Sequence, residues 1–340
     1  MNADKVPARH FERIAGGDNV RCLLCSHRCV IAPGKKGFCR SRANEGGSLY
    51  ALNYGRACAV NIDPIEKKPL HHFLPSTPIV SIGTNFCNFS CKFCQNYEIS
   101  QYETPTVEIS AAKLLELIRG ENGCASLAYT YNEPVIWYEF VMDTAKTIRE
   151  NSYKTVLVTN GDISKEAFVE LAPHIDAMNI DLKAFDKKFY SEMCSGSLES
   201  VCATIETAYK RGIVVELTNL LIPGLNDSDR MINDLVDFAA SVSSDIPLHF
   251  SRYHPAYKMD IPATPAASLH KAFAIASKKM KFVYLGNIAD GEKNSTFCPG
   301  CAKMIIKRIN YFCDPAGIGG GGVCRYCGEK IYGNFYNCGD

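Results

Sequence analysis

Cysteine is the residue type that most constrains this chain, because seventeen cysteines are present and most stand in groups with metal-ligand spacing. In a reducing compartment such cysteines are metal ligands or small buried hydrophobes rather than disulfides. Three groups account for all but the isolated cysteines, which are Cys58, Cys124, Cys194, Cys202, Cys313 and Cys338. The groups therefore predict where the chain binds metals and how it is organised.

The amino-terminal group has the order C-x2-C-x3-C-x9-C and consists of Cys22, Cys25, Cys29 and Cys39. Four thiolates this close in sequence form a closed site. The segment around them shows no helix or strand period, so we expect the metal to supply folding energy. Zinc and a second iron-sulfur cluster both accept four cysteines, and free thiols are the remaining alternative.

The triad consists of Cys87, Cys91 and Cys94, in the order C-x3-C-x2-C, directly after the strand-like run 78–83. Three cysteines are one ligand short of a closed site. A cubane held by three thiolates leaves one iron open for a substrate, just as catalytic zinc with three protein ligands keeps its fourth position open. The spacing therefore predicts a catalytic site rather than a structural one.

The carboxyl-terminal group consists of two C-x2-C pairs on either side of a glycine-rich stretch, with the members Cys298, Cys301, Cys324 and Cys327. Two such pairs are typical of a zinc ribbon. We predict zinc here, with an iron-sulfur cluster or free thiols as the alternatives.

Between these groups, β-branched runs alternate with helical segments. The expected strands are 79–83, 126–131, 155–160, 177–183, 214–222, 248–253 and 282–286, and the expected helices are 110–118, 134–150, 164–171, 198–210, 228–241 and 265–279. Such alternation predicts βαβ units and a parallel sheet. A doubly wound sheet has the same pattern, but the Gly-rich dinucleotide turn expected after its first strand is missing.

Polar residues recur where the expected strands end, and among them are Asn132, Glu133, Asn160, Asp181 and Lys183. In a parallel α/β barrel the carboxyl ends of the strands share one mouth, so we expect these residues to gather beside the triad. Each of them alone could instead be a turn residue, a helix cap or part of a surface ion pair. His71 and His72 could line the same mouth or be structural, and His254 ends the sixth strand.

The net charge of +1 gives no general attraction to nucleic acid or to an anionic membrane. Residues 1–20 contain no apolar stretch of the kind found in secretory signals. No apolar run approaches the roughly 20 residues that a membrane-spanning helix needs. We therefore expect a cytoplasmic protein that binds neither membrane nor nucleic acid.

The triad spacing, with Phe93 before its last cysteine, resembles the signature of the radical S-adenosylmethionine (SAM) superfamily. Two longer strings, DPIEKKPLHHF at 63–73 and FCQNYEIS at 93–100, resemble the radical SAM enzyme of the AmmeMemoRadiSam system. That branch is close to the activating enzymes of pyruvate formate-lyase. Nearly the whole chain takes part in the likeness.

The resemblance implies a partial (β/α)6 barrel, similar to a TIM barrel, over residues 76–290. A four-cysteine metal-binding segment (1–75) would precede it and a zinc-ribbon-like segment (291–340) would follow it. It implies that the triad holds a 4Fe-4S cluster whose open iron binds SAM, with Phe93 near the adenine. Asn132 and Glu133 would meet the methionine amino group, although the activating enzymes have Gly-Gly-Glu at that point. Asn160, Asp181 and Lys183 would approach the SAM carboxylate or ribose.

The implied activity is reductive cleavage of SAM to a 5'-deoxyadenosyl radical, which abstracts hydrogen from an unidentified substrate. An electron donor such as ferredoxin or flavodoxin is required, and other proteins of the AmmeMemoRadiSam system are candidate partners. One alternative is an activase that installs a glycyl radical on a partner enzyme. Another is a metal-bound interaction module in which all three cysteine groups are structural.

Overall fold

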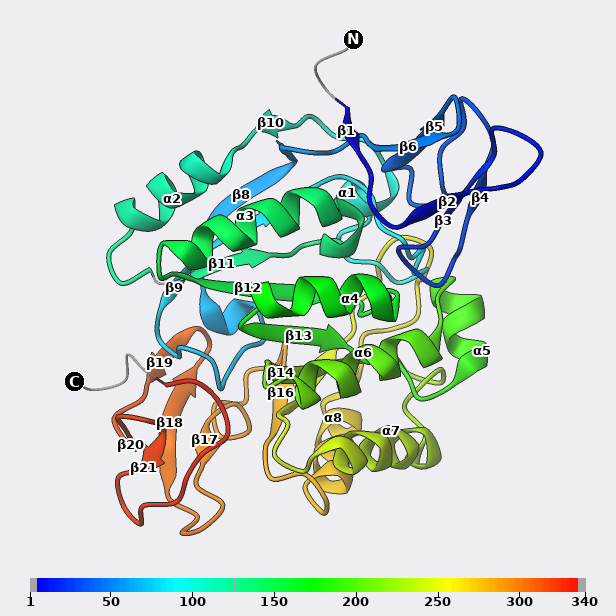
Figure 1. Cartoon of the computed structure of the whole chain (residues 1–340). Coiled ribbons are helices and arrows are strands. Elements are labelled where there is room, and N and C mark those ends of the chain that lie inside the picture. The colour runs from blue at the N-terminus through cyan, green and yellow to red at the C-terminus, as the bar shows by residue number, and fades with distance from the viewer. Residues whose placement is uncertain (1–4, 125, 336–340) are drawn as a thin grey trace.

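The computed structural model describes residues 5–124 and 126–335, and its centre is an eight-stranded sheet (Figure 1). The spatial order of the strands is β16-β15-β14-β13-β12-β11-β9-β8. From β16 to β9 in this order the strands are parallel, and β8 pairs antiparallel with β9. Their bounds are β8 (Ala59–Pro64), β9 (Pro78–Gly83), β11 (Ser126–Tyr129), β12 (Lys154–Thr159), β13 (Ala177–Asp181), β14 (Val214–Leu221), β15 (Leu248–Arg252) and β16 (Val283–Gly286).

The order of the parallel strands follows the chain. A doubly wound sheet reverses its order at a switch point, so that alternative is wrong. The predicted α/β class and parallel sheet are confirmed, with β16 and β8 as the open edges in the described part of the chain. Closure into a six-unit partial barrel stays a prediction.

Helices follow the strands and bury their apolar faces against the sheet. Their bounds are α2 (Ala111–Gly120), α3 (Tyr138–Glu150), α4 (Lys165–Leu171), α6 (Leu198–Lys210), α7 (Asp229–Val242) and α8 (Ala266–Ala276). Four of them begin at a serine whose hydroxyl accepts a backbone N–H three residues on, namely Ser110, Ser164, Ser197 and Ser228. Such caps satisfy backbone N–H groups that lack partners within the helix. Among the described residues, every helix is too short or too polar to span a bilayer.

Short antiparallel strands form the amino-terminal part: β1 (Val6–Pro7), β2 (Phe11–Arg13), β3 (Val20–Cys22), β4 (Val30–Ile31), β5 (Arg42–Glu45), β6 (Ser48–Ala51) and β7 (Arg56–Ala57), the last paired with β10 (Val107–Glu108). The central sheet already begins at Ala59, because β8 pairs with β9 along its length. The predicted boundary at residue 75 therefore falls after the first strand of the sheet. The domain limits themselves stay predictions.

The carboxyl-terminal strands lie at the opposite end of the sheet from β2 to β6 (Figure 1). They are β17 (Thr296–Phe297), β18 (Met304–Ile309), β19 (Phe312–Asp314), β20 (Ile318–Gly319) and β21 (Val323–Cys324). The buried Arg308 guanidinium donates to the His71 carbonyl at 2.6 Å and fastens these strands to the segment before β9. The predicted carboxyl-terminal segment extends to residue 340, and residues 336–340 lie outside the described residues, as does Cys338.

His71 and His72 are buried near the carboxyl-terminal strands, at the end of the central sheet where its parallel strands begin. The His72 ring contacts the Tyr284 hydroxyl at 2.7 Å, and its backbone N–H donates to Glu216 at 2.7 Å. Burial lowers the pKa of His72 to about 4, so its ring is neutral at pH 7. The idea that this pair lines the mouth at the carboxyl ends of the strands is wrong, because its partners sit near the strand starts.

Candidate active site

The triad lies in the loop that leaves the carboxyl end of β9. Cys91 is buried, and Cys87 and Cys94 are partly exposed. The Cys94 sulfur lies 3.2 Å from the Ser100 hydroxyl, and the Phe89 N–H donates to the Cys87 sulfur at 3.3 Å. Burial raises the pKa of Cys87 and of Cys94, so metal binding at these thiols releases protons.

Cys194, one of the isolated cysteines, lies against Cys91. It ends the π-helical turn η4 (Tyr190–Cys194), a geometry often found at functional sites, and its carbonyl accepts the Ser90 N–H at 2.9 Å. The hydrogen bond from Cys194 lowers the pKa of Cys91, whereas burial raises that of Cys194 well above its usual value. These directions favour Cys194 as a neutral thiol that donates to the Cys91 thiolate.

Asn132 follows β11 and fastens the start of the triad loop. Its side-chain amide donates to the backbone carbonyls of Thr84 and Phe86. Tyr131, just before it, adopts a positive φ of 74°, which turns the chain toward that loop. The amide expected near the SAM amino group is thus occupied with positioning the loop before Cys87.

Glu133 is fully buried between the ends of β11 and β12. Its carboxylate accepts the N–H of Val135 at 2.9 Å, the hydroxyl of Thr159 at 2.7 Å and the N–H of Asn160 at 2.8 Å. Burial outweighs these bonds and raises the pKa of Glu133 to about 7. The carboxylate predicted to meet SAM is therefore bonded within the chain, and its contact with SAM stays a prediction.

Asn160 connects this buried carboxylate to the triad. Its side-chain amide donates to Asn88 Oδ1 at 2.8 Å and lies 3.7 Å from the Cys87 sulfur. Gly161 has a φ of +76°, and a Cβ there would meet Ile180 at 2.8 Å. The turn therefore requires Gly161, and it places Asn160 beside the triad.

Asp181 ends β13, and Lys183 follows this strand, on the other side of the triad. Lys183 Nζ lies 2.8 Å from Asp181 Oδ2 and 5.9 Å from the centre of the Phe93 ring. Burial opposes the charge of Lys183, but the charges of Asp181 and Cys91 outweigh it and raise the pKa of Lys183. The side chain of Asn219, near the carboxyl end of β14, donates to the Lys183 carbonyl at 3.0 Å and holds this turn.

The predicted gathering of polar strand ends around the triad is thus observed in the structure. Sequence reasoning missed Cys194 and Asn88, which come to the triad through the fold and carry no spacing signal. His254, after β15, is exposed. The loop that follows it reaches the triad loop, where the Lys258 N–H donates to the Lys92 carbonyl at 3.0 Å.

The carboxyl-terminal group is the one set of three or more ligand side chains, among the described residues, whose ligand atoms all lie within 4.8 Å of one another. Its sulfur separations include 3.5 Å for Cys298–Cys327 and 3.8 Å for Cys301–Cys324. Tetrahedral zinc, with Zn–S near 2.3 Å, holds its sulfurs about 3.8 Å apart. The four residues therefore fit a single metal ion.

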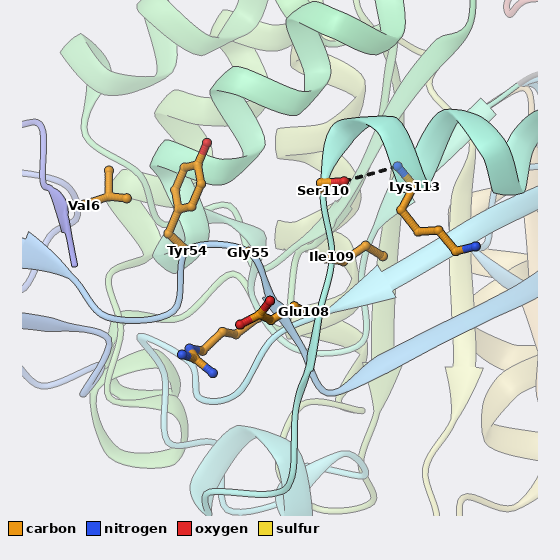
Figure 2. A pocket seen from close by; sticks show the side chains of 8 residues that line it. Val6, Tyr54, Gly55, Glu108, Ile109, Ser110 and Lys113 are labelled. Atoms are coloured by element: carbon orange, nitrogen blue, oxygen red, sulfur yellow. Dashed lines mark hydrogen bonds between the residues drawn. The ribbon is translucent and has the colours of Figure 1, made fainter. Parts of the chain in front are cut away.

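A pocket open to solvent lies away from the triad, between β1 and the start of α2 (Figure 2). Its lining residues are Val6, Tyr54, Gly55, Arg56, Glu108, Ile109, Ser110 and Lys113. None of these is a predicted site residue. Ser110 is occupied there as the cap of α2, accepting the Lys113 N–H.

Known proteins are similar to this chain in amino-acid sequence. The family model described as the radical SAM superfamily matches residues 81–239. The chain is 42% identical over 340 residues to an uncharacterised protein of Methanocaldococcus jannaschii, covering 95% of this chain and 98% of that protein. It is 22% identical over 205 residues to the 4-hydroxyphenylacetate decarboxylase activating enzyme of Clostridioides difficile, covering 56% of this chain and 62% of the relative.

A solved structure shares the fold. The radical SAM methyltransferase from Sphaerobacter thermophilus superposes with a TM-score of 0.53 at 13% identity, covering 83% of this chain and 76% of that one. The family implies a 4Fe-4S cluster and SAM, and the triad at the carboxyl ends of the strands offers thiols of the type such a cluster requires. The chain is an enzyme that belongs to the radical SAM superfamily, as its cysteine spacing predicted.

Proposed function

We propose that this enzyme reductively cleaves SAM at a 4Fe-4S cluster held by Cys87, Cys91 and Cys94 and abstracts hydrogen from an unidentified substrate. The observation that carries the proposal is the position of the three thiols at the strand ends, where the loops after β11, β12 and β13 converge. When bound, the cluster supplies an electron to the SAM sulfonium, which breaks its bond to the 5' carbon.

The chain's own residues orient the reactants and exclude water. Asn132 fixes the loop before Cys87, and the Asn160 amide lies beside the Cys87 sulfur. Lys183, whose ammonium lies 5.9 Å from the centre of the buried Phe93 ring, would meet the SAM carboxylate, as the family resemblance implies. Glu133 would act mainly by holding Asn160. Its Oε2 accepts one hydrogen bond, from the Asn160 N–H, and could accept a second from the SAM amino group.

The test is anaerobic reconstitution with iron and sulfide, reduction by dithionite in the presence of SAM, and chromatography of the products. We expect 5'-deoxyadenosine and methionine in equal amounts. Reconstituted protein that releases neither product, beside an active radical SAM enzyme as a control, would refute the proposal.

A glycyl-radical activase is the second candidate, because relatives of this chain carry that name. One is the Clostridioides difficile enzyme, and another is a putative glycyl-radical enzyme activating enzyme of Methanocaldococcus jannaschii, 25% identical over 185 residues. This function predicts a glycyl radical signal when the enzyme, SAM and a co-purified lyase are mixed. Transfer of deuterium from a small substrate into 5'-deoxyadenosine would instead favour an enzyme that abstracts hydrogen from that substrate itself, alone or with AmmeMemoRadiSam proteins.

Replacing Cys194 by alanine tests its role beside Cys91. We expect the cluster to assemble and cleavage to fall by about tenfold rather than to background, as for other groups that contact a ligand. The reduction potential of the cluster should fall, because a hydrogen bond to a ligand sulfur is lost. An EPR-monitored redox titration measures the shift, and complete loss of the cluster would make Cys194 a fourth ligand instead.

The carboxyl-terminal group is proposed to bind zinc. The Cys324→Ser variant should lose one zinc per chain and have a lower unfolding temperature, because structural zinc contributes folding energy directly. Metal analysis and thermal unfolding check this, with the triad's iron content unchanged as the internal control. Iron in place of zinc at this group in wild-type protein would contradict the zinc proposal.

A further inference from the structure

The amino-terminal group lies beside the triad, because His27, between Cys25 and Cys29, contacts Asn88, the residue after Cys87. The strands β2 to β4 that carry the group lie at the opposite end of the sheet from the carboxyl-terminal strands (Figure 1). The cysteines of the group border a small, partly open cavity that also contacts Asn88 and whose walls include Leu24, Ile31 and Val135. Cys22 is buried and the other three cysteines are partly exposed. These thiols therefore face an apolar space next to the proposed cluster.

The spread of these sulfurs differs from that of the carboxyl-terminal group. Among the described residues, no three of the amino-terminal cysteines bring their sulfurs within 4.8 Å of one another, whereas the four at the other end do. A single zinc ion holds its thiolates about 3.8 Å apart. The corners of a cubane lie farther apart, so the absence of such a tight set is compatible with a larger group such as an iron-sulfur cluster.

A buried cation lies beside these sulfurs. Arg42 is 1% exposed, and its Nη1 lies 3.8 Å from the Cys22 sulfur while its other terminal nitrogen binds Glu139. The Phe38 N–H donates to the Cys29 sulfur at 3.4 Å. Positive charge and hydrogen bonds at the sulfurs stabilise the reduced state of an iron-sulfur cluster, and both are present here.

Short contacts join this group to the triad. The ring nitrogen Nε2 of His27 lies 2.7 Å from the Asn88 carbonyl, and Asn88 is bonded covalently to Cys87. Asp162 adds a second link, because it accepts the Ser26 N–H at 3.0 Å and its carbonyl accepts the Asn88 amide at 2.9 Å. The amino-terminal group and the triad are thus connected by covalently bonded and closely packed atoms, and an electron held at the first group would be close to the second.

The outer side of the group is apolar and positively charged. Val30 is 57% and Phe38 44% exposed, and the side chains of Arg28, Lys35 and Lys36 are exposed around them. Such a surface is complementary to a small acidic protein, because opposite charges steer the encounter and the apolar residues provide contact.

From these contacts we propose that Cys22, Cys25, Cys29 and Cys39 hold a second iron-sulfur cluster, through which an acidic one-electron carrier reduces the triad cluster. The carrier docks at Val30 and Phe38 and is oxidised by one electron. The amino-terminal cluster takes up that electron and passes it to the triad cluster. No bond is made and no proton moves. This inference rests on the proposed function for the delivery of the electron to SAM.

The metal content is tested without any activity. A variant with Cys87, Cys91 and Cys94 all replaced by serine is reconstituted anaerobically with iron and sulfide. We expect iron and acid-labile sulfide to remain, together with an EPR signal after reduction, and zinc only at the carboxyl-terminal group. A second zinc per chain, or no metal at the amino-terminal cysteines, would overturn the inference.

The route is tested with two reductants. The Arg28→Glu/Lys35→Glu/Lys36→Glu variant should cleave SAM like wild type with dithionite. With reduced flavodoxin we expect cleavage at subsaturating carrier to slow by at least about tenfold, and the wild-type rate to fall with salt. The control, Lys278→Glu/Lys279→Glu/Lys307→Glu, has the same charge change on another surface and should match wild type with both reductants.

In the Cys25→Ser/Cys29→Ser variant the flavodoxin-driven rate should fall far more than the dithionite-driven rate, because only the first depends on the amino-terminal cluster. Equal flavodoxin-driven rates in wild type and the Arg28, Lys35 and Lys36 variant would refute the docking surface. Equal rates in the Cys25 and Cys29 variant would refute the relay. Failure of wild type with dithionite would instead refute the proposed function, so the two failures are distinguishable.

Discussion

The Cys91→Ser variant will lose SAM cleavage, with 5'-deoxyadenosine falling to the level of the metal-free protein. Cys91 is the buried member of the triad, and its neighbours include the Cys194 thiol and the charge of Lys183. Both neighbours lower the pKa of Cys91 and favour the thiolate that iron requires. A serine hydroxyl at this position is a much poorer iron ligand. Product chromatography and iron analysis of the reconstituted variant measure the loss.

The matched control is Cys202→Ser, which changes an isolated, partly exposed cysteine on α6. It should retain both the triad cluster and cleavage at wild-type levels. Wild-type cleavage by Cys91→Ser would refute the ligand assignment, and loss of activity in both variants would trace the effect to folding.

Replacement of Glu133 by alanine should lower the free energy of unfolding by about 3–5 kcal/mol, because three buried donors lose their acceptor. These donors are the N–H of Val135, the hydroxyl of Thr159 and the N–H of Asn160. Cleavage should fall as well, since Asn160 would no longer be held beside Cys87. Urea unfolding of metal-matched samples measures the first effect and product formation the second.

The exposed Glu116 on α2 provides the control for this change, because its pairing with Lys113 lies in solvent. Glu116→Ala should change stability by no more than about 0.5 kcal/mol. The stability of Glu133→Gln should fall between those of wild type and Glu133→Ala. The glutamine amide keeps one acceptor oxygen, but its NH2 group faces a donor that the carboxylate had accepted from. A Glu133→Ala protein as stable as wild type would contradict the positioning role.

Much of the fold follows from local sequence patterns. The helix that begins after Ser110 and the one that begins after Ser228 combine a capping hydroxyl with an apolar face, and both features lie within one segment. The parallel order of the sheet follows from strands that alternate with such helices. In contrast, β8 joins the sheet as an antiparallel strand. The alternation of strands and helices predicts parallel strands only, so it gives no signal for β8.

The site was predictable where one chain segment supplies the chemistry, as at the triad. It was not predictable where the fold joins distant segments: Cys194 lies about a hundred residues after Cys91 and reaches it through the turn η4. The roles of Asn132 and Glu133 also depend on their partners. The sequence shows that Asn132 has an amide and Glu133 a carboxylate, but only the structure shows which backbone and side-chain groups bond to them.

The central claim is that one iron at the triad has no protein thiolate and is bound by SAM. The most direct measurement is electron-nuclear double resonance on the reduced enzyme with SAM labelled by 15N at its amino group. We predict a 15N coupling to the cluster in wild type and none in Cys91→Ser. Reduced wild-type enzyme that binds labelled SAM but shows no such coupling would contradict the claim.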